Sequence, residues 1–282
     1  MSGSTSLLGR SWKQKQTRIG TAIIVVVLFI TFVGPLLAPH SATEFVGPPF
    51  TGSTSAAPLG TDVLGHDVLS RTLRGGLFVV WSSIAAAIVA MLIGVSLGLL
   101  AGYRGGMSDG VTMRGFDIVL AFPQLILVLL FVSMVGPKAW LIVLLTGIAL
   151  SPGVARVTRG LTMEVSKRDF VRAAELMGIS RWRILWSEIL PNLSSALLVE
   201  FTTRMIWAIG IIASLSFLGL GPAAEDGNWG LMINENRAGL PIQPLGVIAP
   251  VAVMAGFAIG AGLIAEGIGR AMARIESTKA AR

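Results

Sequence analysis

The chain has 282 residues, of which 53% are hydrophobic and 13% are charged; soluble domains typically carry roughly 25% charged residues. It contains no cysteine, which excludes a disulfide framework and a thiolate metal site. The net charge of +7 does not indicate nucleic-acid binding, because the basic residues lie at the ends of apolar segments and form no continuous stripe. The excess of apolar residues therefore indicates a membrane protein.

Six apolar segments follow in chain order, each near the roughly 20 residues that a helix needs to cross a bilayer. They cover residues 19–38, 75–103, 118–137, 139–155, 189–220 and 240–265. Because lipid offers no partner to free backbone groups, we expect each segment to be a helix. The first is longer than the apolar core of a signal peptide, so we expect it to stay as an anchor. The predicted fold is all-α, with six transmembrane helices in a single domain over residues 19–270.

The positions of the basic residues predict the orientation of the chain. Of the 22 Lys and Arg residues, 17 lie in the N-terminal segment 1–18, around Arg104 and Arg114, in the loop 156–188, or from Arg270 to the C-terminus. Basic loops stay in the cytoplasm, so we expect both termini and the loop 156–188 to be cytoplasmic and the protein to lie in the cytoplasmic membrane. Residues 39–74 are then an external loop, and residues 271–282 a cytoplasmic tail.

The cytoplasmic loop contains a stretch that is suited to binding another protein. Residues 167–186 predict two short helices that meet at Gly178, where a positive φ allows a sharp turn. Ser180 is placed to cap the second helix, and Pro191 marks the entry into the next span. The interface that we predict comprises Phe170, Arg172, Ala173, Ala174, Glu175, Met177, Gly178, Ile179, Ser180 and Arg181. Within it, Phe170, Ala173, Ala174 and Met177 are expected to share one helix face, with Arg172, Glu175, Arg181 and Arg183 flanking it.

Two charged residues lie inside the fifth span. Glu200 precedes Arg204 by four residues, the favourable order for an ion pair within a helix. Ionisable groups in a membrane are candidates for function, so the pair is a possible part of a translocation path. A mutually neutralised structural pair is the alternative interpretation.

Outside the spans, the external stretch places Asp62, His66, Asp67 and Arg71 at helical spacings. We interpret it as an amphipathic helix at the membrane surface rather than a metal site, since a fourth ligand is missing. The later external loop carries Glu225, Asp226 and Trp229, which suit either a pore rim or, for the tryptophan, an interfacial anchor.

In the second span, Gly94, Gly98 and Gly102 recur every four residues, a spacing that allows close helix packing.

Several motifs resemble one family. Ala173-Ala174-x3-Gly178 followed by Leu190-Pro191 is similar to the E-A-A loop of ABC importer permeases. LGTDVLGHDVLSR (59–71), AGYRGG (101–106), MRGFDIVLAFP (113–123), ILPN (189–192) and SLSFLGLG (214–221) resemble the peptide/nickel type, and within it the C-type subunit of dipeptide and oligopeptide importers. The resemblance extends from about residue 19 to residue 270. The chain departs from the family pattern at His66, Arg172, Glu188 and Ile212.

The resemblance implies a type I ABC importer permease that is coupled to its motor through residues 168–191. It also implies the partners: a homologous second permease, two ABC ATPase subunits, an external solute-binding protein and the lipid bilayer. The chain has neither a G-x-x-x-x-G-K-[ST] nor an H-E-x-x-H sequence, so ATP and Mg²⁺ are expected in the partner subunits, with no cofactor and no enzyme activity in this chain.

Three alternatives stay open. The same machinery would serve nickel chelates, glutathione or haem as cargo. A transporter driven by an ion gradient would predict repeats or interrupted helices with ionisable groups at the midplane. A membrane anchor that does not transport would tolerate loss of the external motifs.

Overall fold

The structure is a computed structural model that describes residues 11–12, 14–222 and 227–280, with side chains as far as residue 272. The described chain is helical, and its only β features are two isolated bridges in the loop before α4. In order, the elements are α2 (Lys15–Phe32), α3 (Gly34–Leu37), α4 (Val68–Arg74), α5 (Leu77–Arg104), α6 (Gly106–Leu120), α7 (Gln124–Val135), α8 (Ala139–Val165), α9 (Asp169–Leu176), α10 (Arg181–Arg183), the π-helix η1 (Ile184–Ile189), α11 (Leu190–Phe217), α12 (Trp229–Asn236), the 3₁₀-helix η2 (Arg237–Gly239) and α13 (Leu245–Ala280).

Five of the expected spans correspond to long apolar helices within the described residues: α2, α5, α8, α11 and α13. The boundaries differ from the expected ones chiefly where helices continue into polar sequence. Helix α8 runs ten residues past 155 to Val165, and α13 runs past 265 to Ala280. Loss of hydrophobicity therefore marks where a helix leaves the apolar region rather than where it ends.

The third expected span, residues 118–137, is not a single helix. It is divided between α6 and α7, which are bent by 74° at the break between Leu120 and Gln124. Pro123 lies in that break. It has no N–H to continue the helix, and its ring disfavours helical backbone at Phe122. A sixth crossing exists in the described chain only if this bent pair counts as one span.

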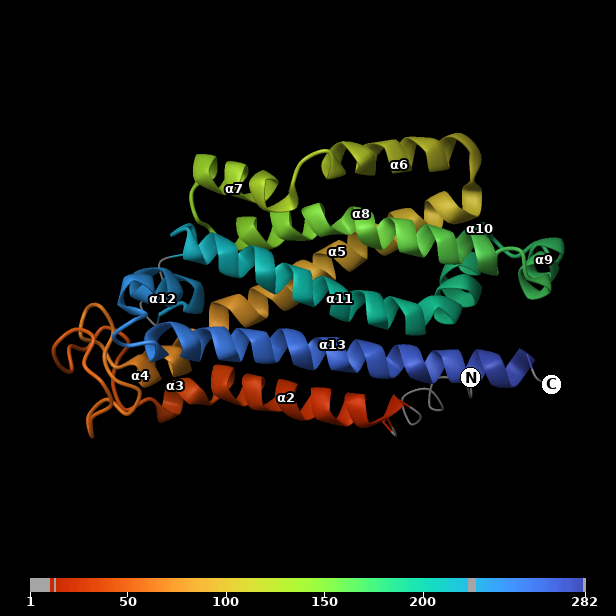
Figure 1. The fold of residues 1–282 in the computed structure, drawn as a ribbon. Coiled ribbons are helices and arrows are strands. Elements are labelled where there is room, and N and C mark those ends of the chain that lie inside the picture. The colour runs from red at the N-terminus through yellow and green to blue at the C-terminus, as the bar shows by residue number, and fades with distance from the viewer. Residues whose placement is uncertain (1–10, 13, 223–226, 281–282) are drawn as a thin grey trace.

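The long helices lie side by side, and the short elements gather at the two ends (Figure 1). One end, here called the α9 end, carries α9, α10, the first turn of α2 and the last turn of α13. The opposite end, the α12 end, carries α12, α3, α4 and the long loop that precedes α4. The two ends of the described chain therefore lie on the same side as α9.

Helices α5 and α8 approach each other more closely than side chains would allow. A Cβ atom on Gly94 would lie 2.5 Å from the Val154 side chain, and one on Gly98 would lie 2.6 Å from the Ala155 carbonyl oxygen. A Cβ atom on Gly102 would likewise lie 2.7 Å from the Arg159 carbonyl oxygen. The prediction that these glycines allow close packing is confirmed, and the contacts lie within the subunit.

Three apolar clusters fill the interior. The central one joins α5, α7, α8 and α11, a second lies at the α9 end, and a third joins α2, α5, α12 and α13. Trp229 belongs to the third cluster and is fully buried, with its indole N–H donating to the Thr72 carbonyl at 2.7 Å. Its interpretation as an interfacial anchor is therefore wrong. Glu225 and Asp226 lie outside the described residues.

Candidate functional site

The candidate site is the exposed turn between α8 and α11, which we call the elbow segment (residues 169–183, from the start of α9 to the end of α10). Its eight-residue helix α9 follows α8 after a link of three residues. Gly178 ends this helix with a φ of +74°, and the Ile179 N–H donates to the Ala174 carbonyl at 3.1 Å. The predicted change of direction at Gly178 is confirmed, and glycine adopts this backbone conformation without the strain of a side chain.

The two faces of α9 differ from the expected arrangement. Val171 and Ala174 are buried in the apolar cluster at the α9 end, together with Leu185 and Ile189. Ala174 therefore does not share an outward face with Phe170, Ala173 and Met177, as we had expected. A helix that packs on a core must turn part of its surface inward, and the spacing of three and four residues did not show which part.

The outward surface of the elbow segment carries four large apolar side chains among charged ones. Leu176 is 89% exposed, Met177 72%, Trp182 55% and Phe170 37%. Arg172, Ala173, Glu175, Gly178, Ser180 and Arg181 are also exposed, whereas Ile179 is partly buried. Large apolar side chains that are grouped on a short projecting helix and flanked by charges are typical of a protein-binding surface. Leu176 and Trp182 were not among the residues that we had predicted for the interface.

Beyond Gly178 the chain does not form a second separate helix. Helix α10 has three residues and continues directly into the π-helix η1 and then α11. Ser180 occupies the N-cap position of α10, but its side chain makes no capping hydrogen bond, so that part of the prediction is wrong. Pro191 lies in the first turn of α11, as expected, but η1 precedes it without a break, so its missing N–H interrupts the hydrogen-bond ladder there.

Two side chains at the end of α5 reach the elbow segment. The Tyr103 hydroxyl donates to the Glu175 carboxylate at 2.6 Å, and the Arg104 guanidinium lies 6.0 Å from the centre of the Trp182 ring. Sequence reasoning missed both contacts, because residues more than 70 positions apart give no local pattern. The available signal was the AGYRGG motif, where Gly105 and Gly106 have positive φ and turn the chain sharply after Arg104.

The Glu200–Arg204 ion pair is present, as predicted. Arg204 Nε donates to Glu200 Oε1 at 2.7 Å, and both side chains are largely buried between helices. The Arg204 guanidinium lies against Gly153 of α8, where an added Cβ would come within 2.7 Å of its nitrogens. The pair therefore joins α11 to α8 within this subunit.

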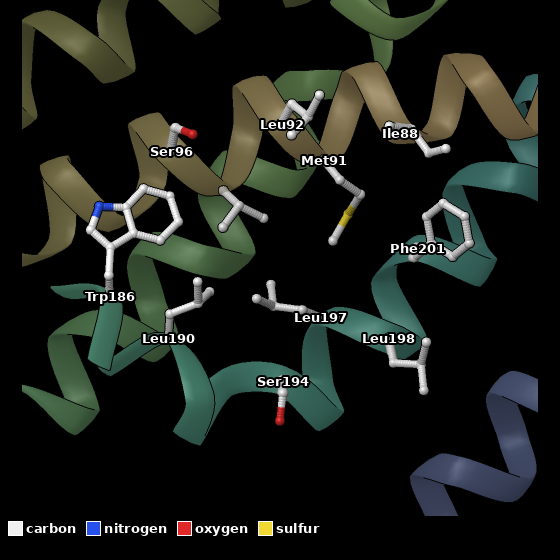
Figure 2. Close-up of a pocket in the computed structure, with 11 residues that line it drawn as sticks. Ile88, Met91, Leu92, Ser96, Trp186, Leu190, Ser194, Leu197, Leu198 and Phe201 are labelled. Atoms are coloured by element: carbon white, nitrogen blue, oxygen red, sulfur yellow. The ribbon is translucent and has the colours of Figure 1, made fainter. Parts of the chain in front are cut away.

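A groove of about 410 Å³ runs between α5 and the start of α11 (Figure 2). Its lining is almost wholly apolar and comprises Ile88, Met91, Leu92, Val95, Ser96, Trp186, Leu190, Ser194, Leu197, Leu198 and Phe201. Its polar side-chain groups are the hydroxyls of Ser96 and Ser194 and the indole N–H of Trp186, so the groove offers no charged partner to an ionic solute. Its chemistry suits an apolar helix or an acyl chain better than a charged solute.

The motif at residues 59–71 forms a buried polar cluster, and the helix that we expected to run through Asp62 and His66 begins only at Val68. Helix α4 begins at Val68, and Asp67 caps it by accepting hydrogen bonds from the N–H groups of Leu69 and Ser70. Asp62 is fully buried and pairs with Arg71, which also contacts Glu235 of α12 at 2.9 Å. A buried carboxylate needs such partners, and these contacts hold residues 62–67 in a non-helical loop. Val68 is buried, whereas Leu64 is 53% exposed.

Comparison with known proteins places these features in a family. Residues 94–274 match the family model described as "binding-protein-dependent transport system inner membrane component". The chain is 35% identical over 244 residues to a glutathione transport system permease protein of Pectobacterium atrosepticum, covering 86% of this chain and 81% of that relative. It is 32% identical over 264 residues to a dipeptide transport system permease protein of Haemophilus influenzae, covering 90% of each. An oligopeptide transport system permease protein of Bacillus subtilis is 29% identical over 256 residues, with 90% of this chain and 84% of the relative covered.

Proposed function

This chain belongs to the family of binding-protein-dependent transport system inner membrane components, and from that membership we propose that it is a permease subunit of an ATP-driven importer of di- or oligopeptides. Its partners in this proposal are a homologous second permease, two ABC ATPase subunits and an external solute-binding protein. The names of its relatives support the cargo, since they comprise dipeptide, oligopeptide and glutathione permeases. Glutathione is itself a small peptide, so it is the second cargo to test.

The observation that carries the proposal is the exposed apolar surface of the elbow segment. Leu176 and Met177 project from a helix that is anchored on its other face by Val171 and Ala174. A rigid helix with an uncovered apolar surface is suited to a cleft in a partner protein. We propose that the ATPase provides this cleft and that Arg172 and Arg181 contribute charged contacts at its rim.

The orientation of the chain follows from its charge. The basic residues in the first turn of α2, in the elbow segment and at Arg270 of α13 belong to the α9 end. The positive-inside rule then places that end and both termini in the cytoplasm, and the α12 end outside. The elbow segment thereby faces the compartment that contains ATP.

The transport step that we propose requires no covalent chemistry in this chain. ATP and Mg²⁺ bind to the partner ATPases, whose closure displaces α9. The permease then changes between two arrangements of its helices, and the bound ATPase biases the equilibrium between them. Glu200 and Arg204 hold α11 against α8 during this change. Whether the pair also contacts the solute is tested by replacing both residues and measuring peptide uptake.

Reconstitution tests the proposal against its main rival. Proteoliposomes that contain both permeases and the ATPases, with ATP inside and the binding protein outside, are expected to take up labelled di- to pentapeptides. Uptake should stop without ATP and should continue when an ionophore dissipates ion gradients. Uptake that continues without ATP but is abolished by the ionophore would show a gradient-driven transporter instead. The absence of peptide uptake alongside uptake of glutathione alone would narrow the cargo to that molecule.

A further inference from the structure

Helix α9 is attached at its first residue to α8 and near its last turn to α5. Its first residue follows α8 after the link 166–168, and near its last turn Glu175 accepts the hydrogen bond from Tyr103 at 2.6 Å. Tyr103 is the single tyrosine of the sequence and the next-to-last residue of α5. A hydrogen bond to a carboxylate is about twice as strong as one between neutral groups, and it is directional. It therefore fixes the rotation of a helix whose buried face is small.

Helices α5 and α8 form a single rigid pair at this end. Gly98 and Gly102 lie so close to α8 that their missing Cβ atoms would meet the carbonyl oxygens of Ala155 and Arg159. Helix α6 strengthens the pair, because Asp109 accepts two hydrogen bonds from the Arg159 guanidinium, of which Nη2–Oδ2 measures 2.5 Å. Backbones packed without intervening side chains have little freedom to separate.

The connection from α9 to α11 is not a continuous α-helix. It passes through the turn at Gly178, the three residues of α10 and then the π-helix η1. In η1 the Leu190 N–H donates to the Leu185 carbonyl, five residues back instead of four. Single turns of π-helix are rare and are frequently found at functional sites. The second polar contact across this region, Arg104 to Trp182, is exposed and lies at 6.0 Å, the outer limit for a cation–π interaction.

We propose that the Tyr103–Glu175 hydrogen bond clamps α9 to the α5–α8 pair, so that displacement of α9 moves α5 and α8 as one body and reaches α11 through Gly178 and η1. Tyr103 is then a positioning residue: it sets the angle at which α9 meets its partner. The inference rests on the proposed function for the source of the displacement. The clamp itself is a property of this chain.

The test compares Tyr103→Phe, Glu175→Ala and Glu175→Gln in the assembled complex. Thr112→Val is the matched control, because it removes a hydroxyl whose bond, to the Ser108 carbonyl, stays within α6. The chain has no cysteine, so spin labels at Asp169→Cys and Met107→Cys, both exposed and outside the predicted interface, report the distance from α9 to the start of α6. Peptide uptake per ATP hydrolysed is measured on parallel samples of the same variants that carry no labels.

We expect Tyr103→Phe and Glu175→Ala to broaden the distance distribution and to reduce uptake per ATP, while ATP hydrolysis continues. Glu175 is exposed, so water competes for its carboxylate, and we expect loss of this hydrogen bond to shift the equilibrium between held and released α9 by about two- to fivefold. Glu175→Gln keeps an acceptor oxygen and should retain part of both properties. The double variant Tyr103→Phe with Glu175→Ala should equal either single variant, since both remove one bond.

The clamp is refuted if Tyr103→Phe matches Thr112→Val in distance distribution and in uptake per ATP. It is also refuted if the two single effects add, because separate roles for the two side chains would then be required. Failure of the proposed function has a different signature: the complex with the unaltered chain shows no ATP-driven uptake. In that case the distance distributions still decide whether Tyr103 holds α9.

Discussion

The guanidinium of Arg204 on α11 lies against Gly153 on α8, and it can come this close because Gly153 has no side chain. A methyl group at Gly153 would come within 2.7 Å of the guanidinium nitrogens, which Glu200 holds in place. We predict that Gly153→Ala destabilises the protein by about 1–3 kcal/mol, the usual result of overpacking a filled site. Gly160→Ala on the same helix is the matched control, because its Cβ meets no atom within 4 Å. In detergent, the melting temperature of Gly153→Ala should be lower than that of Gly160→Ala. Equal melting temperatures would contradict the close contact between Gly153 and Arg204.

Neutralising one member of the Glu200–Arg204 pair should cost more than neutralising both. Glu200→Gln leaves the Arg204 charge largely buried inside a span, which typically destabilises by about 3–5 kcal/mol. The double variant Glu200→Gln with Arg204→Met leaves no buried charge, so it should fold better than the single one and retain peptide uptake. If the double variant is stable but inactive in uptake, the pair belongs to the solute path as well as to the α8–α11 contact.

The buried Asp62–Arg71 pair should be needed for the structure of the α12 end. Arg71→Met removes the guanidinium that faces both Asp62 and Glu235, leaving the Asp62 carboxylate without its cation. We expect a loss of about 3–5 kcal/mol and faster proteolysis of the loop 39–67. Lys138→Met is the comparison, since Lys138 is an exposed cation at the start of α8, outside this loop. Equal protease sensitivity of the two variants would show that the buried pair does not hold the loop.

His40 should make the same region sensitive to pH. Its Nδ1 lies 3.1 Å from Glu44 Oε1 and its Nε2 lies 3.0 Å from the Ala56 carbonyl oxygen. Both neighbours are acceptors, so this geometry suits a ring protonated on both nitrogens. The hydrogen bond to Glu44 raises the pKa of His40 above its ordinary value of 6.5.

Because the pKa is raised in the folded state, the stabilising contribution of His40 is complete below pH 6.5 and is lost as pH rises through the folded-state pKa. The difference in melting temperature between the native chain and His40→Gln should therefore shrink from pH 6 to pH 8. The chain has two histidines, so NMR titration of the imidazole signals gives the pKa directly. A His40 pKa at or below 6.5 would contradict the prediction.

The sequence allowed prediction of those features that depend on local pattern. Apolar length located α2, α5, α8, α11 and α13, and the spacing of Glu200 and Arg204 predicted their ion pair. Gly178 was recognised as a turn because few other residues adopt positive φ without strain.

Features that depend on tertiary contacts were missed or misjudged. Helical spacing suggested a helix through Asp62 and His66, but the buried partners of Asp62 keep that stretch in a loop. The inward position of Ala174 depends on a cluster contributed by four other elements, α5, α8, η1 and α11. The Tyr103–Glu175 bond joins residues that are far apart in sequence, so local pattern could not predict it. Pro123 did carry a local signal for the break between α6 and α7, but the continuous apolar run concealed it.

Cross-linking from the elbow segment tests the central claim most directly. A single cysteine at Leu176 or Met177, introduced into the cysteine-free chain, should react with the ABC ATPase subunit in intact membranes. A cysteine at Met107, which is 86% exposed on α6, is the matched control and should yield little of that product. If Leu176→Cys and Met177→Cys capture no ATPase, or capture it no better than Met107→Cys, the elbow segment is not the site at which the motor acts.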